Sequence, residues 1–354
     1  MFNRISRIIS KFHKNKIDSL LVTNPANLLY LCGYSGSNGM LLAKKGAPAI
    51  FYTDFRYQEQ IKQEVKGCQT KIWDRSLFSI FPVQDLVRVN SLGFEGNSLT
   101  YHNFSLIKKQ LKSNINFVAT SELVERQRCV KDKQEIEKIS RAVRNTDKVF
   151  LNVLKMIKPG ITEKDLANEI DYQFLKLGGI AFPSIVAFAE RGALPHAQPT
   201  NKKLKKGDVI VFDIGVKFEH YCADMTRTVV MGKASSKVKK VYDIVLTAQQ
   251  MAQQKIRAGK KAQDIDRIAR NYIKDKGYGE YFGHGLGHGV GLAVHELPVV
   301  NSKSTDLIQI NQVFSVEPGI YLANEFGVRI EDLVVAQKSG CEILTKSPKE
   351  LIEL

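Results

Sequence analysis

Apolar positions along the chain repeat with two periods, and each period predicts a different kind of element. In the first part, residues 5–12 place Ile5, Ile8, Ile9 and Phe12 on one helical face. The short apolar runs Ile17–Val22 and Ala49–Thr53 predict strands, Asn24-Pro25 predicts a turn, and Asp54–Lys66 predicts a helix. Strands that alternate with helices are typical of an α/β domain.

A charge-rich string at Glu125–Lys133 separates this part from the rest, so we expect domains at residues 1–125 and 126–354. A long helix follows, with apolar residues at Ile136, Ile139, Val143, Val149, Val153 and Met156 and an end at Lys158-Pro159-Gly160. Thr162 and Asp165 then have the order of a capping box, which opens a second helix that stops at Gly178-Gly179.

From Gly207 onward the pattern becomes rich in strands. The expected strands are Val209–Gly215, Tyr221–Met231, Val313–Glu317 and Val328–Val335, with helices at about Ser235–Arg257 and Ala262–Lys276 between them. No tandem repeat of short period is visible.

Composition places the chain among ordinary globular proteins. Its 354 residues are 44% hydrophobic and 25% charged, which excludes collagen-like and wholly disordered chains. No run approaches the ~18 apolar residues of a membrane span. The five cysteines are widely spaced without a C-x-x-C pair, which predicts free thiols, a reducing compartment and a cytoplasmic enzyme.

The net charge of +16 raises the question of a nucleic-acid partner. Most basic residues are scattered, with modest clusters at Lys202–Lys206 and Lys237–Lys240. We therefore interpret this charge as general surface charge, and expect neither a nucleic acid nor a membrane as partner.

Four carboxylates stand on separate apolar strands. Asp213 shares a strand face with Val209 and Val211, and Asp224 follows eleven residues later, so a hairpin would bring the two acids together. Glu317 ends another predicted strand, and Glu331 lies inside a fourth, with Arg329 on the same face. Taken alone, the two aspartates could equally be structural acids paired with Arg227.

The segment Gly283–Glu296 holds three histidines and five glycines in fourteen residues, in a chain with only seven histidines. Glycine at this density lets the backbone approach another group closely, and imidazole supplies a neutral ligand or proton carrier. Four buried carboxylates would repel one another unless cations held them. Together with one imidazole they could hold two divalent ions about 3.5–4 Å apart, of Mn²⁺, Co²⁺, Fe²⁺ or Zn²⁺.

The order of these residues resembles the pita-bread metallopeptidases, most closely the Xaa-Pro branch with aminopeptidase P and prolidase. The segments that carry the resemblance are PHAQPTNKKLKKGDVIVFDIGVKF, YCADMTRTVVMG, FGHGLGHGVGLAVHELP, VFSVEPGIY and GVRIEDLVV. The first half resembles the creatinase-type amino-terminal domain through TNPANLLYLCGYSGSNG and YTDFRY. The resemblance implies an α/β creatinase-like domain followed by an α+β pita-bread catalytic domain.

Carried over residue by residue, the resemblance implies a set of five ligands for two metal ions, with Mn²⁺ as the first expectation. These are Asp213, Asp224, His288, Glu317 and Glu331, with Asp224 and Glu331 bridging both ions. It further implies that His196 and His295 line the substrate carbonyl, that His284 and Arg329 line the proline side, and that Tyr321 lies near the proline pocket. Ala293 departs from the acidic or polar residue of many relatives.

Such ions would lower the pKa of a shared water toward about 7 for attack on the carbonyl before proline. His295 would then stabilise the oxyanion, and Glu317 would act as general base. The purely structural alternatives are core packing for Tyr321 and a structural hydrogen bond for His284.

On this basis we expect a metallo-aminopeptidase that releases the N-terminal residue from Xaa-Pro peptides, because SGSNG and TDFRY are more like that branch. The alternative is an Xaa-Pro dipeptidase. A methionine aminopeptidase is disfavoured because such enzymes usually lack a domain like residues 1–125, and a basic binding protein is a remote alternative. The resemblance also implies a homodimer.

Overall fold

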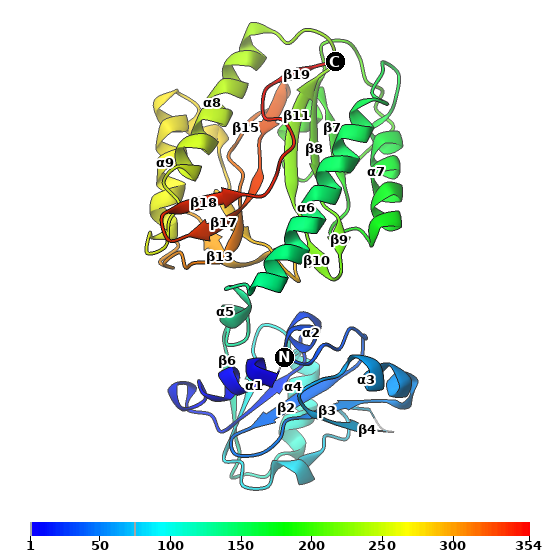
Figure 1. Ribbon diagram of the computed structural model, residues 1–354, viewed down its shortest axis with the longest axis vertical. Helices are drawn as coiled ribbons and strands as arrows, with labels where there is room; N and C mark the ends of the chain where they lie inside the picture. Colours follow the sequence, from blue (N-terminus) through cyan, green and yellow to red (C-terminus); the bar gives the residue numbers. More distant parts are fainter. Residues whose placement is uncertain (1, 74–75) are drawn as a thin grey trace. The chain divides into compact units, whose positions relative to one another are not determined.

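The structure is a computed structural model that describes residues 2–73 and 76–354 (Figure 1). The chain forms two compact units, the first ending at Arg128 and the second covering Cys129–Leu354. Within the described residues, no helix combines the length and the apolar character that crossing a membrane would need.

The first unit is an α/β domain around one mixed sheet of six strands in the order β4-β3-β2-β1-β5-β6. The strands are β1 Ser19–Val22, β2 Met40–Lys44, β3 Ile50–Thr53, β4 Gln69–Ile72, β5 Ser91–Glu95 and β6 Asn116–Thr120. The helices are α1 Phe2–Ile9, α2 Pro25–Cys32, α3 Gln58–Glu64, α4 Tyr101–Gln110 and α5 Glu125–Arg128. Strands β1 to β3 are almost wholly buried, which explains their continuous apolar runs.

The turn expected at Asn24-Pro25 is wrong, because these residues begin helix α2. The Asn24 side chain accepts hydrogen bonds from the backbone N–H groups of Ala26 and Asn27, and Pro25 occupies the first helical position. An asparagine cap followed by proline is a helix start as well as a turn signal, and the apolar residues that follow decide for the helix.

The second unit holds four long helices, α6 Lys133–Leu154, α7 Glu163–Leu177, α8 Ser236–Gln253 and α9 Ala262–Asp275. One sheet has the order β19-β11-β8-β7, with β7 Ile185–Phe188, β8 Val209–Ile214, β11 Met225–Val230 and β19 Ile352–Glu353. The other has the order β13-β12-β14-β17-β18, with β12 Gly287–Gly289, β13 Glu296–Val300, β14 Val313–Val316, β17 Asp332–Gln337 and β18 Gly340–Ile343. Two small hairpins complete it, β9 Lys217–Phe218 with β10 Tyr221–Cys222, and β15 Gly319–Leu322 with β16 Phe326–Arg329.

The second unit repeats one arrangement twice, at a period too long for the sequence to reveal. In each half two helices precede an antiparallel strand pair, β8 with β11 and β14 with β17. A small hairpin interrupts each pair between its two strands. Helix α6 contacts β9 and β10 and α7 contacts β7, whereas α8 contacts β14 to β16 and α9 contacts β13, so each helix pair covers its own strands (Figure 1).

Local sequence signals account for the helix ends. Asp132 with Glu135 and Thr162 with Asp165 form complete capping boxes at α6 and α7, the second as predicted. Helix α6 ends at Leu154, so Met156 lies beyond it and is 40% exposed, contrary to its expected place on the apolar face.

Two predicted strands are each split by an acid. Tyr221–Met231 divides into β10 and β11 around Asp224, and Val328–Val335 divides into β16 and β17 around Glu331. Glu331 therefore lies at a break and not inside a strand. Its backbone N–H donates to Thr226 O at 3.1 Å, which joins the two sheets at the points where both strands are interrupted.

Candidate active site

The repeated strand pairs bring the four predicted carboxylates together. Asp213 in β8 lies opposite Thr226 in β11, and Asp224 directly precedes β11 at the same end of the pair. In the other half Val316 pairs with Asp332, so Glu317 and Glu331 continue that register at the end of β14 and the start of β17. The hairpin expected to make Asp213 and Asp224 converge is confirmed.

His288 reaches the same place from β12, the short strand beside β14. A Cβ atom on Gly287 would lie 2.0 Å from Ser315 O, so only glycine lets β12 approach β14 this closely. The Ser315 hydroxyl accepts from His288 N at 3.0 Å and donates to Glu317 Oε1 at 3.0 Å. The glycine-rich segment thus serves the close packing that sets His288 against the carboxylates.

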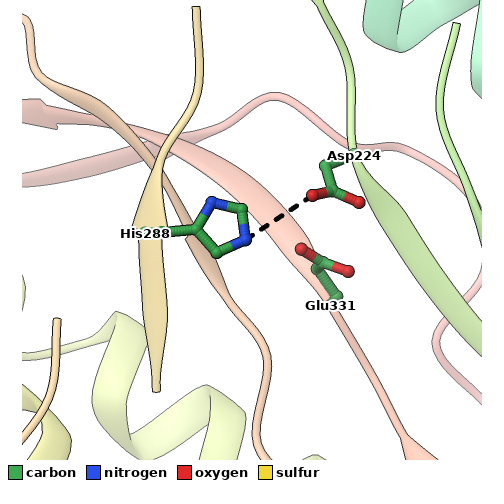
Figure 2. Close-up of side chains that lie close together, drawn as sticks. All are labelled: Asp224, His288 and Glu331. Atoms are coloured by element: carbon green, nitrogen blue, oxygen red, sulfur yellow. Dashed lines mark ion pairs between the residues drawn. The ribbon is translucent and has the colours of Figure 1, made fainter. Parts of the chain in front are cut away.

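Asp224, His288 and Glu331 form a compact group, whose potential ligand atoms all lie within 4.8 Å of one another (Figure 2). The three side chains point toward a common centre from three different strands or strand ends. His288 Nε2 lies 3.6 Å from Asp224 Oδ2 and 3.2 Å from Glu317 Oε1. The imidazole therefore links this group to the fourth carboxylate.

Asp213 and Glu331 are held from behind by polar side chains. Arg329 Nη2 donates to Asp213 Oδ2 at 2.6 Å, and its Nε donates to Thr226 Oγ1 at 2.9 Å. Thr226 in turn donates to Glu331 Oε2 at 2.7 Å. Arg329 thus orients one oxygen of Asp213 directly and one oxygen of Glu331 through Thr226.

Burial of so many acids shifts their proton affinities. Burial raises the pKa of Asp224 well above its ordinary value, and the nearby Glu331 carboxylate adds to the shift. Burial likewise raises the pKa of Glu331, reinforced by Glu317. Burial is the largest single influence on the pKa of His288 and would lower it, but the hydrogen bond with Glu317 and the negative charges of Glu317 and Glu331 together outweigh burial and raise that pKa to about 9. Four acids thus share the cavity wall with one arginine or lysine among the described residues, Arg329.

The donor set fits a pair of divalent cations. Asp213 Oδ1 and Glu331 Oε1 are buried without a hydrogen-bond partner among the described residues, a costly condition that a cation would relieve. Carboxylate oxygens with a single imidazole suit Mn²⁺, Co²⁺, Fe²⁺ or Zn²⁺. The assignment of all five side chains as ligands stays a prediction, and the residues present are chemically suited to it.

Metal binding is expected to stabilise the second unit, and more so at alkaline pH. In the metal-free protein, the raised pKa values of Asp224 and Glu331 favour folding when both carboxyls are protonated, at pH values below their pKa values in the unfolded chain. This contribution to stability is lost as the pH rises through their pKa values in the folded protein. A metal ion binds the deprotonated carboxylates and removes this loss.

Thermal unfolding with Mn²⁺ or with EDTA, at pH 5.5 and pH 8.0, measures this effect. At about 100 times the dissociation constant, a bound ion adds about 2.7 kcal/mol, or roughly 5–10 °C for a domain of this size. We expect the larger rise in melting temperature at pH 8.0 and almost none in Glu331→Gln. An equal or larger rise at pH 5.5 would contradict the proposed link between protonation and metal binding.

A cavity of about 650 Å³ opens over the carboxylates, and every predicted site residue lies on its wall. The predicted site residues on its wall are His196, Asp213, Asp224, His284, His288, His295, Glu317, Tyr321, Arg329 and Glu331. The remaining wall includes Phe182, Pro183, Ile185, Val294 and Val299. An apolar wall beside a charged centre is the ordinary composition of a ligand pocket.

His196 lies on an exposed loop whose ends are fixed by one buried acid. Glu163 is fully buried and accepts from the backbone N–H groups of Phe188 at 2.9 Å and Thr200 at 2.8 Å. Arg191, inside the loop, donates to the same carboxylate at 3.0 Å. The loop therefore holds His196 at the cavity through a carboxylate at the start of α7.

His284, Tyr321 and Arg329 form a connected group on another side of the cavity. His284 Nε2 and Tyr321 Oη are 2.9 Å apart, and Arg329 Nη1 donates to Tyr321 Oη at 2.8 Å. Burial raises the pKa of Tyr321 to about 12, so the phenol stays protonated. His284 makes the structural hydrogen bond considered for it, and Tyr321 is more than core packing because its hydroxyl lies between two cavity residues.

Sequence reasoning missed Thr226 and Ser315, the hydroxyls that orient Glu331 and Glu317. Ser315 shares a strand face with Glu317 two residues away, a signal that period-2 reasoning could have found. The pairing with Arg227 that was considered for the two aspartates is wrong, because Arg227 Nη2 lies 2.8 Å from Asp332 Oδ1. That ion pair is buried behind the site.

Comparisons with known proteins agree with this geometry. Residues 137–338 match the sequence family described as Metallopeptidase family M24, and residues 4–130 match the Creatinase/Prolidase N-terminal domain. The chain is 36% identical to the Xaa-Pro dipeptidase of Pyrococcus horikoshii, over 99% of both chains.

Two solved structures show the same likeness along their whole length. The Xaa-Pro dipeptidase from Bacillus anthracis is 37% identical with a TM-score of 0.96, over 99% of both chains. The X-Pro aminopeptidase from Thermotoga maritima is 37% identical with a TM-score of 0.89, over 99% of this chain and 100% of the other. The expected creatinase-like domain followed by a pita-bread catalytic domain is thereby confirmed. This chain belongs to metallopeptidase family M24 and is a peptidase that depends on divalent metal ions.

Proposed function

We propose that this protein is an Xaa-Pro dipeptidase that hydrolyses the bond before proline in dipeptides. The observation that carries the proposal is identity of 36–37% to two proteins of that name over 99% of each chain, with all five predicted ligand side chains around one cavity. These comparisons support the dipeptidase alternative better than the aminopeptidase expected from the sequence. Aminopeptidase activity is the competing proposal, because the chain is also similar to the X-Pro aminopeptidase from Thermotoga maritima.

The segments that favoured the aminopeptidase have a local structural explanation. Asn38 Nδ2 in SGSNG donates to Asp54 Oδ2 in TDFRY at 2.5 Å, and the hydroxyls of Ser37 and Tyr57 are 2.7 Å apart. Thr53 Oγ1 donates to Asn38 O at 2.5 Å. The two segments therefore bind each other within the first unit. These contacts give both segments a structural role that is independent of the length of the peptide substrate.

Two divalent ions held by Asp213, Asp224, His288, Glu317 and Glu331 would supply an activated water and stabilise negative charge on the substrate oxygen. Mn²⁺ is the proposed ion, and Co²⁺, Fe²⁺ and Zn²⁺ are the alternatives. The homodimer and the cytoplasmic location stay predictions.

Glu317 is the residue that we propose for proton transfer. Its Oε1 accepts a hydrogen bond from Ser315 Oγ at 3.0 Å and lies 3.2 Å from His288 Nε2, whereas Oε2 makes no hydrogen bond with the described residues. With one oxygen holding a metal ion, the other would take a proton from the attacking water and return it to the proline nitrogen as the C–N bond breaks. The nitrogen before cleavage carries no hydrogen, so it needs this proton to leave as a neutral amine.

The cavity offers groups for the rest of the substrate. His295 and His196 are proposed to donate to the carbonyl oxygen, and the apolar wall suits the proline ring. Arg329 is the one arginine or lysine among the described residues lining the cavity. Four of its five N–H groups bond to Thr226, Tyr321, Asp213 and Pro195, which leaves one for the free carboxylate of a dipeptide.

Peptide length tests the proposal. We expect kcat/KM for Xaa-Pro to exceed that for Xaa-Pro-Yaa-Zaa by more than about tenfold, because a buried cation loses its carboxylate partner in the longer peptide. Competition between Ala-Pro and Ala-Pro-Ala-Ala, followed by mass spectrometry, measures the ratio, with Ala-Ala as the control without proline. Preference for the tetrapeptide would assign the aminopeptidase, and equal cleavage of Ala-Ala would remove the proline specificity.

A further inference from the structure

A buried ion pair lies beside the cavity, outside the predicted ligand set. Lys131 Nζ lies 2.7 Å from Glu296 Oε1, and the two side chains are 1% and 6% exposed. Lys131 Nζ also donates to Cys129 O at 3.2 Å. Glu296 follows His295 directly in the glycine-rich segment.

A buried pair of this kind is weak evidence for stability, because apolar residues of similar volume often fold equally well. The pair does fix the relative positions of the two side chains, because separating two buried charges costs much electrostatic free energy.

The lysine side of the pair is anchored to the frame of the catalytic unit. Lys131 N donates to Asn311 O at 3.0 Å, and Val130 forms a β-bridge with Gln312. These partners directly precede β14, and Glu317 directly follows the end of that strand. Lys131 is thus fixed relative to the strand that carries the proposed general base.

The glutamate side shapes the loop that carries His295. A Cβ atom on Gly291 would lie 2.4 Å from Glu296 Oε1, so the absence of a side chain there lets the loop lie directly against the carboxylate. Gly291 N donates to Ala293 O at 3.0 Å, and Gly291 O accepts from Cys222 N at 2.8 Å. The loop is therefore wrapped around the Glu296 carboxylate.

His295 itself has little to hold it. Its imidazole is exposed to the cavity and makes no hydrogen bond with the residues that the structure describes. Its ring contacts that of His288 with centroids 4.2 Å apart. The position of the imidazole hence depends on the backbone beside it, and that backbone is fixed by Glu296.

We propose that Lys131 is a positioning residue, which acts through the buried Glu296 carboxylate to hold His295 against the substrate carbonyl. The role given to His295 rests on the proposed function, whereas the dependence of its imidazole on Lys131 does not.

A double-mutant cycle between Lys131→Met and His295→Ala tests the proposal. We expect Lys131→Met to lower kcat about tenfold with KM changed less than twofold and metal content unchanged. In the His295→Ala background the same substitution should leave kcat unaltered, because its route of action is gone. An equal loss of kcat in both backgrounds would show a general structural role and overturn the proposal.

Loss of one charge can also impair folding, so a second variant keeps the test decisive. Lys131→Met with Glu296→Gln removes both charges, and we expect it to fold and still show about tenfold lower kcat. Full kcat in this variant would contradict the proposal. Lys240→Met, on the exposed face of α8, is the matched control.

A readout without turnover separates this proposal from the proposed function. The imidazole NMR signal of His295, assigned by its loss in His295→Ala, is expected to shift in chelated Lys131→Met and to stay in place in Lys240→Met. An unmoved signal would overturn the positioning role even if Xaa-Pro dipeptides are cleaved. A shifted signal in a protein that cleaves no Xaa-Pro dipeptide would contradict only the proposed function.

Discussion

Glu331→Gln is expected to lower kcat on the order of a thousandfold and to abolish binding of at least one of the two ions. The variant keeps the shape of the side chain but removes the charge of an oxygen that is buried without a hydrogen-bond partner among the described residues. Metal ions supply several kcal/mol of charge stabilisation, and each 1.36 kcal/mol corresponds to a factor of ten in rate. Asp224→Asn is expected to behave in the same way.

Mn²⁺ titration calorimetry and turnover of Ala-Pro measure the two effects on the same preparation. Glu342→Gln is the control, because Glu342 is an exposed glutamate in β18 of the same unit. Two ions bound with undiminished affinity, or turnover within tenfold of the unaltered protein, would rule out the bridging role given to Glu331.

His295→Ala is expected to lower kcat by about 10² to 10³, the usual cost of losing one donor to a developing oxyanion. KM should change little, since the donor acts mainly in the transition state. Metal content should be unchanged because His295 is outside the predicted ligand set.

Steady-state kinetics with Ala-Pro over a range of concentrations separates kcat from KM. His102→Ala, an exposed histidine of α4 in the first unit, is the matched control. A raised KM with unchanged kcat would contradict this prediction and would show that His295 contributes to substrate binding and not to transition-state stabilisation.

The fold was predictable where local signals agree with one another. Helix α6 was predictable from its apolar spacing and helix α7 from its capping box. Strands β1 and β3 were predictable from their buried apolar runs. Asn24-Pro25 misled because the same two residues open a helix or a turn. The twofold arrangement of the second unit stayed hidden because it is a repeat of topology and not of residues.

The members of the site were predictable, but the contacts between them were not. Acids at the ends of apolar strands are costly and therefore visible in a sequence, as Asp213 and Glu317 illustrate. Thr226 and Ser315 are common residues in buried strands, so nothing marks them until their hydroxyls are seen beside Glu331 and Glu317. The buried Lys131 escaped notice because one lysine among 52 basic residues carries no signal.

Anomalous diffraction from crystals of this protein grown with Mn²⁺ would show whether the five side chains bind two metal ions. We expect two peaks about 3.5–4 Å apart, enclosed by Asp213, Asp224, His288, Glu317 and Glu331. No peak within reach of Asp224 and Glu331, or manganese bound only elsewhere on the protein, would contradict it.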